Sequence, residues 1–256
     1  MRCPLVYTPP MAFRIVLATT LLSLAPLCGQ ESGAHQPPAG PAPHLLNGKP
    51  DMSGVWEHPY AGDMTKDAPN QKGMAELPFT DLGRKEWDAH DAANGDYTGA
   101  CLPFGLMRSI NSPHPMQIVQ NNDYIAFLFE QNTWFHVVPT DGRPHNKNQE
   151  PTWHGDSVGR WEGNTLIIDT VNFNGKTRLD TIGHPHSTAL HVIETLQRTD
   201  AGHIAYTITI DDPKYYTRPW KNTRTFTLRP DWQIMEYSCE ENNKDIFDGH
   251  IKGIKQ

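Results

Sequence analysis

The chain has little cysteine and no recognisable cofactor motif in its 256 residues. Its four cysteines form no C-x-x-C pair, so a zinc site built from cysteine thiolates has no support. No glycine-rich nucleotide motif, flavin motif or haem motif occurs. These absences leave a mechanism that uses no organic cofactor, or one that uses a single divalent metal ion.

Basic charge is also scarce. Residues 1–30 contain Arg2 and Arg14 and no acidic residue, so the rest of the chain carries 20 basic against 29 acidic residues. No basic stripe is present that could follow a nucleic acid or an anionic membrane surface. We therefore expect a small-molecule ligand or substrate as the partner, and no nucleic acid.

Only one long apolar run is present, and it lies near the N-terminus. A short positive segment ending at Arg14 is followed by apolar residues 15–27, which predicts a secretory signal peptide over residues 1–30. The run is too short for a comfortable membrane span, so we expect a periplasmic or secreted protein. Lipidation of Cys28 is an alternative, although Leu27 is bulky where lipoproteins place a small residue.

Residues 31–50 are rich in proline and glycine and predict a flexible leader. Residues 51–256 can bury one good core and predict a single domain. This domain retains only Cys101 and Cys239, and two lone cysteines in an oxidising compartment most simply form one disulfide. Two buried free thiols are the alternative.

Alternating apolar residues predict antiparallel strands from about residue 115 onward. In residues 203–211, for example, isoleucines and a tyrosine share one face while two threonines share the other. The predicted strands are 116–120, 124–130, 133–139, 157–161, 165–173, 190–198, 203–211, 222–229 and 233–239. We expect an all-β fold, an antiparallel up-and-down meander of about eight or more strands that closes as a lipocalin-like barrel. A two-sheet β-sandwich is the alternative.

Two features precede the strands. Residues 80–95 predict one helix, with Thr80 as its N-cap and Gly95 as its stop. Gly54 and Trp56 form the G-x-W tripeptide with which lipocalin-type barrels begin, and in such barrels the tryptophan plugs the closed end. Residues 57–79 and 94–114 look irregular.

Strand direction predicts where the connections lie. If neighbouring strands alternate, the short turns lie at one end of the barrel and the long connections lie together at the other. The short turns are 162–164, 199–202 and 230–232, and the long connections are 140–156, 174–189 and 212–221. Long loops at one rim of a rigid scaffold commonly hold ligand chemistry, so we expect a composite site there.

Histidine chemistry is the mechanism that these loops predict. His186 is the first candidate for the general base, and His154 is the candidate for the partner acid. Asp156 or Asp180 would orient an imidazole, while Arg143 would hold the substrate or stabilise developing negative charge. The expected substrate-binding residues are Asp141, Arg143, Trp161, His184, Tyr216 and Trp220.

The stretch GHPHSTALHVIE, residues 183–194, raises the question of a metal. His184 and His186 share a face if the chain is extended, and His154 is the candidate for a third ligand. Glu194 follows His186 by eight residues, which does not match the spacing in cupins. We assign no metal site, but these three histidines are the expected ligands if one divalent metal binds. In the alternative interpretation the stretch is a shaped loop, with His191 as an ordinary strand residue.

Residues 155–159, GDSVG, formally match the G-x-S-x-G motif of serine hydrolases. A nucleophile elbow needs a strand before the serine and a helix after it. Here a polar segment precedes Ser157 and a predicted hairpin follows, so we do not expect a serine nucleophile.

Six longer strings resemble a widespread family of exported bacterial proteins whose members are mostly labelled hypothetical. They are PDMSGVWE, TDGRPH, PTWHGDSVGRWEGNTLIIDTVNFN, GHPHSTALHVIE, DPKYYTRPW and EYSCEENNKD, and they occur in this order between about residues 50 and 245. The resemblance implies a single exported domain and brings no activity with it. A looser similarity to calycin barrels rests on G-x-W and topology.

The sequence thus favours an exported enzyme that acts on a small aromatic or carbohydrate-derived molecule at the open end of a barrel. Lyase, hydratase, isomerase and hydrolase chemistry all fit histidine acid–base catalysis. The alternatives are a lipocalin-like carrier of a hydrophobic ligand and a metal-binding protein of the cell envelope.

Overall fold

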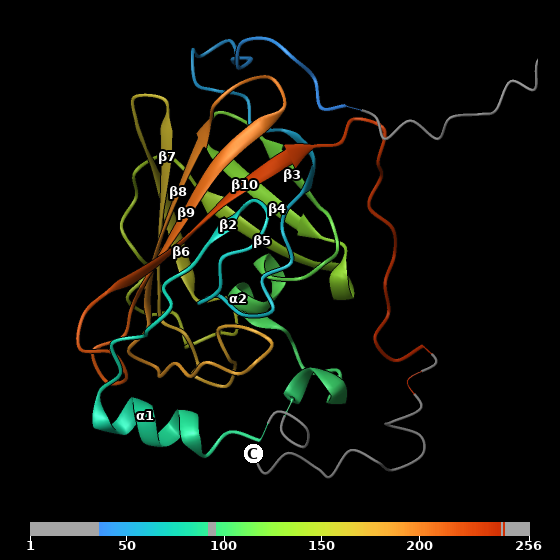
Figure 1. The fold of residues 1–256 in the computed structure, drawn as a ribbon. Helices are drawn as coiled ribbons and strands as arrows, with labels where there is room; N and C mark the ends of the chain where they lie inside the picture. The colour runs from blue at the N-terminus through green and yellow to red at the C-terminus, as the bar shows by residue number, and fades with distance from the viewer. Residues whose placement is uncertain (1–35, 92–95, 242, 244–256) are drawn as a thin grey trace, which may run out of the picture. The chain divides into compact units, whose positions relative to one another are not determined.

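The computed structural model describes residues 36–91, 96–241 and 243, and the predicted signal peptide lies outside them. Their central feature is one antiparallel sheet that curls into a nearly closed barrel (Figure 1). The strands are β1 (Gly54–Glu57), β2 (Gln71–Lys72), β3 (Met116–Gln120), β4 (Tyr124–Phe129), β5 (Trp134–Pro139), β6 (Asp156–Glu162), β7 (Thr165–Val171), β8 (His191–Arg198), β9 (His203–Asp211) and β10 (Trp220–Leu228). The helices are α1 (Asp81–Asp88) and α2 (Gly105–Ile110), with 3-10 turns at Tyr97–Ala100 and Gln131–Thr133.

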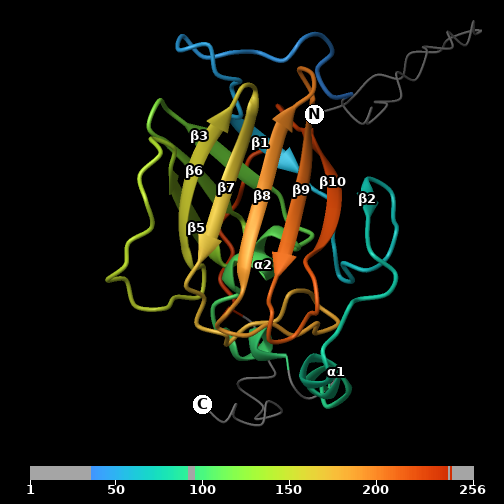
Figure 2. The same ribbon diagram turned by 90° about the vertical axis from the view of Figure 1, so that its left-hand side faces the viewer.

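The strand order confirms the predicted meander. Hydrogen-bonded neighbours run β5-β4-β3-β1-β10-β9-β8-β7-β6, and β2 pairs with β10 beside this path. β5 and β6 are the two ends of the path, and Figure 2 shows the sheet curving to bring them together. A Cβ atom added to Gly159 on β6 would lie 3.2 Å from the carbonyl oxygen of Pro139 on β5. The two edges therefore meet without forming a ladder, which leaves a seam in the barrel.

Alternation of side chains builds the core, as the sequence predicted. Along β9 the residues at even positions are buried, and Ile204, Ile208 and Ile210 are all 0% exposed. This period of two is what an antiparallel strand with one buried face requires. The outer face of the same strand carries the threonines.

The G-x-W tripeptide lies where the sheet curls round on itself. β1 pairs with β3 on one side and with β10 on the other, with Trp56 opposite Leu228. Gly54 has φ +136°, and a Cβ atom there would lie 2.5 Å from Leu228, so this position requires glycine. Trp56 is completely buried, and the guanidinium of Arg198 lies 5.1 Å from its ring centroid. Trp56 thus fills the end of the barrel where the short turns lie, as predicted.

Three local predictions differ from the structure. Residues 233–239 form no strand, because β1 already occupies the free edge of β10. The helix predicted over 80–95 ends at Asp88, with Thr80 as its N-cap as predicted, and Gly95 lies outside the described residues. Residues 105–110, predicted to be irregular, form α2, all six residues of which are buried.

Arg224 on β10 joins α2 to the barrel interior, because its Nη1 atom donates to the carbonyl of Ile110 over 2.9 Å. No helix within residues 36–91 or 96–241 is both long enough and apolar enough to span a bilayer.

Candidate functional site

Two of the three long loops lie at the same end of the barrel, as strand direction predicted, but the first of them along the chain does not (Figure 2). Because nine strands alternate along the path, its end strands β5 and β6 point the same way, so the connection between them runs along the seam and reaches this end only in its last residues. The three loops are residues 140–155, 172–190 and 212–219. Hydrogen bonds join them in sequence. The backbone N–H of Thr152 donates to the carbonyl of Asn172 over 3.1 Å, and the hydroxyl of Ser187 donates to Asp212 over 2.9 Å. Loops 172–190 and 212–219 are therefore connected at this end, and the last residues of loop 140–155 join them there.

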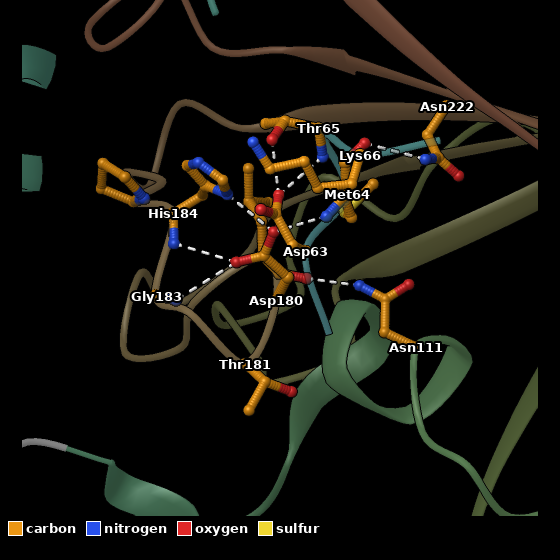
Figure 3. A network of polar contacts seen from close by, with 12 residues as sticks. Asp63, Met64, Thr65, Lys66, Asn111, Asp180, Thr181, Gly183, His184 and Asn222 are labelled. Atoms are coloured by element: carbon orange, nitrogen blue, oxygen red, sulfur yellow. Dashed lines mark hydrogen bonds and ion pairs between the residues drawn. The ribbon is translucent and has the colours of Figure 1, made fainter. Parts of the chain in front are cut away.

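Asp180 is the centre of a buried hydrogen-bond network in the second loop (Figure 3). Its side chain is 0% exposed. Oδ1 accepts from the backbone N–H groups of Gly183 at 3.2 Å and His184 at 3.1 Å, and Oδ2 accepts from that of Met64 at 2.9 Å. Backbone groups from two segments thus fix the carboxyl group in one orientation.

The side chain of His184 completes this network. Its Nδ1 atom lies 2.6 Å from Oδ2 of Asp180. An ionised carboxylate only accepts hydrogen bonds, so Nδ1 carries the proton in this pair and a neutral ring keeps its lone pair on Nε2. Within the described ranges no group hydrogen-bonds to Nε2, and this atom is not among the fully buried polar atoms without a partner. His184 as a whole is only 4% exposed, so Nε2 lies just beneath the surface.

Aromatic side chains border His184. The ring of Trp87 on α1 stacks on the imidazole with a centroid separation of 4.4 Å and an angle of 17°. Phe79 lies 6.4 Å from the imidazole and stacks on Tyr216 at 5.3 Å. Both Trp87 and Phe79 are partly exposed. Together they give the histidine an aromatic wall.

The N-terminus of α1 positions this wall. The hydroxyl of Thr80 accepts from the N–H of Gly83 over 3.0 Å and donates to the carbonyl of Lys214 over 2.7 Å. A Cβ atom at Gly83 would lie 2.1 Å from the carbonyl oxygen of Tyr215, so only glycine allows the helix to approach the third loop this closely.

Asp63, Asp180 and His184 are the group among the described residues whose ligand atoms already lie close enough together to hold one metal ion. Each offers one ligand atom, and the three atoms lie within 4.8 Å of one another. However, both oxygens of Asp180 already accept two hydrogen bonds each, and Oδ1 of Asp63 accepts two from Thr65. A metal there would have to displace the proton on Nδ1 of His184.

His186, the predicted base, lies on the same loop but has neither ring nitrogen free. Nε2 is 2.5 Å from the hydroxyl of Thr177, and Nδ1 is 3.1 Å from the carbonyl of Ser187. Burial lowers the pKa of His186 to about 4. A neutral imidazole that bridges two loop positions is typical of a structural histidine.

His154, the predicted acid, lies beside another histidine that sequence reasoning did not select. Its ring stacks on that of His136 on β5 at 5.9 Å, and Trp134 lies 5.6 Å away. Burial lowers the pKa of His154 to about 4 and that of His136 to about 3. Two buried neutral imidazoles pack here as ring systems, with Nε2 unpartnered in both.

The residues predicted in the first loop gather at the seam. A pocket of about 280 Å³ lies between β5 and β6, and Arg143 and Asp156 line it. The guanidinium of Arg143 contacts Asp141 at 2.6 Å and the hydroxyl of Tyr124 at 3.0 Å. Hydrogen bonds from Arg143 lower the pKa of Asp141 to about 2. The carboxylate of Asp156 accepts from the backbone N–H of Asn146 over 2.8 Å.

The remaining predicted residues divide between the two ends. Tyr216 and Trp220 are buried at the loop end, and the hydroxyl of Tyr216 donates to the carbonyl of Pro185 over 2.8 Å. Burial raises the pKa of Tyr216 above its usual value. Trp161 lies near the short turn after β6, with Lys49 above its ring, and so belongs to the opposite end.

Cys101 and Cys239 form the predicted disulfide. It anchors the segment after β10, whose Met235 N–H donates to Glu130 over 2.9 Å. The bond indicates an oxidising compartment.

The structure thus pairs His184 with Asp180 and adds residues that sequence reasoning missed. Asp63 and Phe79 come from a segment without periodicity, and nothing in their spacing marks them. Trp87 had a weak signal, because it follows the Thr80 cap on the predicted helix and is the one large aromatic residue there.

Comparison with known proteins gives no family. No protein-family model and no curated protein matches the chain. Among solved structures, a secretory abundant heat soluble (SAHS) protein from Ramazzottius varieornatus aligns with a TM-score of 0.33 and 9% sequence identity. The alignment covers 70% of this chain and 95% of that chain.

Proposed function

We propose that this protein is an exported enzyme that transfers protons to or from a small aromatic or carbohydrate-derived molecule at the long-loop end of its barrel. His184 is the general base or acid, and Asp180 orients it. Lyase, hydratase, isomerase and hydrolase reactions all need such a step. Proton transfer itself requires no organic cofactor.

The observation that carries the proposal is the contact between Asp180 and His184. A completely buried carboxyl group holds Nδ1 at 2.6 Å while Nε2 has no partner among the described residues. A carboxylate in this position fixes the tautomer and ring orientation and stabilises the imidazolium that forms when Nε2 accepts a proton. His186 lacks these properties because both of its nitrogens are bonded.

The surroundings of His184 support a flat ligand. Trp87 and Phe79 offer partly exposed rings at the imidazole, and offset stacking of a ligand ring on such a wall is worth about 0.5–1.5 kcal/mol beyond its buried area. The disulfide supports export, since it indicates an oxidising compartment.

The interior of the barrel favours an enzyme over a carrier. A carrier of a hydrophobic ligand needs a deep and mostly apolar cavity. Here α2 is buried inside, and the polar groups of Glu194 and Arg224 face the same interior. At the long-loop end, by contrast, His184 lies directly beside the partly exposed rings of Trp87 and Phe79.

Hydrolysis of p-nitrophenyl acetate tests the proposal, because this aromatic ester reports any accessible catalytic imidazole. Water attacks the carbonyl carbon while Nε2 of His184 takes its proton, and p-nitrophenolate leaves. We expect His184→Gln to lower the turnover roughly 10²-fold or more, the usual contribution of a general base. The matched control is His203→Gln, since His203 also pairs with an aspartate, Asp200 at 2.9 Å, but near the short turns.

The control should retain the wild-type rate. Circular dichroism and the midpoint of thermal unfolding check that both variants fold. The proposal fails if folded His184→Gln keeps the wild-type rate, or if the wild-type protein is no faster than free imidazole at equal concentration.

A further inference from the structure

A second cluster of histidine and aspartate side chains lies on the outer face of the barrel, beside the seam. Asp156 on β6, Asp169 on β7 and His191 on β8 alternate with buried neighbours and so point outward. His145 reaches them from the first long loop. None of these groups contacts the Asp180–His184 pair in the hydrogen bonds of the described residues.

Two imidazole nitrogens converge on one carboxylate oxygen in this cluster. Nε2 of His145 lies 3.1 Å from Oδ1 of Asp169, and Nε2 of His191 lies 2.9 Å from the same oxygen. Two ligand atoms bound to one metal ion at about 2.0–2.2 Å are separated by distances of this order. Each histidine and the aspartate can therefore be neighbours in one coordination sphere.

The other nitrogen of His145 has the partner that metal-ligating histidines usually have. Its Nδ1 atom lies 3.0 Å from Oδ2 of Asp156, whose orientation is fixed by the backbone N–H of Asn146. A carboxylate on Nδ1 sets the tautomer that leaves Nε2 free to coordinate and makes that nitrogen more basic.

The charge of the cluster also suits a cation. With neutral imidazoles, Asp156 and Asp169 leave two negative charges that no described lysine or arginine pairs with. His145 has a carboxylate at each ring nitrogen. A divalent ion would offset the negative charge of both carboxylates.

We propose that His145, Asp169 and His191 bind a divalent transition metal ion, with Zn²⁺ the best match to this ligand set. Two imidazoles and one carboxylate leave at least one position for water, which is typical of open zinc sites. Both nitrogens contact Oδ1 of Asp169, but they lie more than 4.8 Å from each other, so binding requires the histidines to rotate toward each other. Their side chains are 28% and 38% exposed, which leaves them free to do so.

Binding would join the first long loop to two strands. His145 lies on loop 140–155, Asp169 on β7 and His191 on β8, so a shared ion cross-links three segments that border the seam pocket. A ligand that binds only the folded protein raises the unfolding midpoint as its concentration rises. Zn²⁺ is therefore expected to stabilise the protein and to reduce hydrogen exchange in residues 140–149.

Equilibrium binding of Co²⁺, used as a coloured substitute for Zn²⁺, tests the site without any activity assay. We expect one ion per chain from visible absorbance, displaced by Zn²⁺. Binding should be lost in His145→Ala and in His191→Ala. Asp156→Asn should weaken it about 10–100-fold without abolishing it, because Asp156 acts through His145.

Two further variants distinguish this site from metal binding elsewhere on the protein. His203→Ala removes a comparably exposed, aspartate-paired histidine and should leave binding unchanged. Asp63→Asn alters the other metal-compatible group and should also leave it unchanged. Loss of Co²⁺ in Asp63→Asn, equal binding in wild type and His145→Ala, or no binding to the wild type would each overturn the proposal. None of these results depends on turnover by His184.

Discussion

Asp180 and Glu194 are both buried carboxyl groups, but the protein surrounds them differently. Asp180 accepts four hydrogen bonds, three of them from backbone N–H groups. Glu194 accepts one at Oε1 from Tyr206 at 2.7 Å, and its Oε2 atom is buried without a partner. Burial therefore raises the pKa of Glu194 to about 7.

This shift predicts a pH-dependent stability that a single substitution removes. The folded pKa of about 7 exceeds the unfolded value of 4.5, so the folded state binds the proton more tightly. The contribution of the protonated Glu194 side chain to the free energy of unfolding is complete below pH 4.5 and is lost as the pH rises through 7. Between pH 4.5 and 8, the free energy of unfolding of Glu194→Gln should rise by about 3 kcal/mol relative to that of the wild type. This order-of-magnitude figure follows from about 1.4 kcal/mol per pKa unit.

Urea unfolding of both proteins at several pH values measures that difference. Because only the difference between the two curves is used, other titrating groups cancel. Parallel curves for wild type and Glu194→Gln would show that Glu194 is ionised and well solvated in the folded protein.

Residue roles in the loops were the least predictable part of the site. His184 and His186 are equivalent by spacing, and His186 was the first candidate for the base. Which histidine keeps an unbonded Nε2 atom depends on Thr177 and Asp180. The positions of these two residues follow from loop contacts that leave no periodic pattern in the sequence. Sequence spacing therefore located the right stretch without distinguishing its members.

At the scale of elements, the contact between α1 and the third loop sets the aromatic wall. In an exposed helix, Gly to Ala stabilises by about 0.5–1 kcal/mol. At Gly83 the added Cβ atom would lie 2.1 Å from the backbone oxygen of Tyr215, so alanine should destabilise the protein here instead of stabilising it. We expect Gly83→Ala to destabilise the protein by about 1–3 kcal/mol.

Thermal unfolding gives the size of this effect, and hydrogen exchange of residues 80–90 localises it. Lys85→Ala, on the exposed side of the same helix, is the matched control and should be nearly neutral. Unaltered exchange and a higher unfolding midpoint in Gly83→Ala would mean that α1 is not held against the loop.

Strands were predictable because a buried face imposes a period of two. The pattern failed at residues 233–239, which alternate like a strand but have no edge to pair with. Pairing partners are a property of the closed sheet, and β1, more than 170 residues earlier in the chain, fills the place beside β10. α2 was missed because its residues are buried on all sides, which removes the amphipathic period.

At the scale of the whole molecule, strand direction correctly placed loops 172–190 and 212–219 at one end, but it was wrong for loop 140–155, because β5 and β6 meet at the seam pointing the same way. It did not give their positions around the barrel. Loop 140–155 connects β5 and β6 across the seam, whereas the other two loops meet α1. The single site expected from the sequence is therefore two clusters, one containing Arg143 and Asp156 and the other Asp180 and His184.

The disulfide also acts at this scale. It joins Cys239, after the last strand, to Cys101, before the first long β-hairpin, at a sequence separation of 138. The final described segment is thereby held along the barrel, where the Thr133 hydroxyl donates to the carbonyl of Tyr237 over 3.0 Å. The cysteine count predicted the pairing correctly.

The central claim is that Asp180 holds His184 with a proton on Nδ1 and leaves Nε2 as the reactive nitrogen. Long-range ¹⁵N–¹H NMR of histidine-labelled protein at pH 8 measures this directly, with His184→Gln assigning the signal. We expect a protonated Nδ1 and an unprotonated Nε2 for His184. A His184 ring with its proton on Nε2 would contradict it.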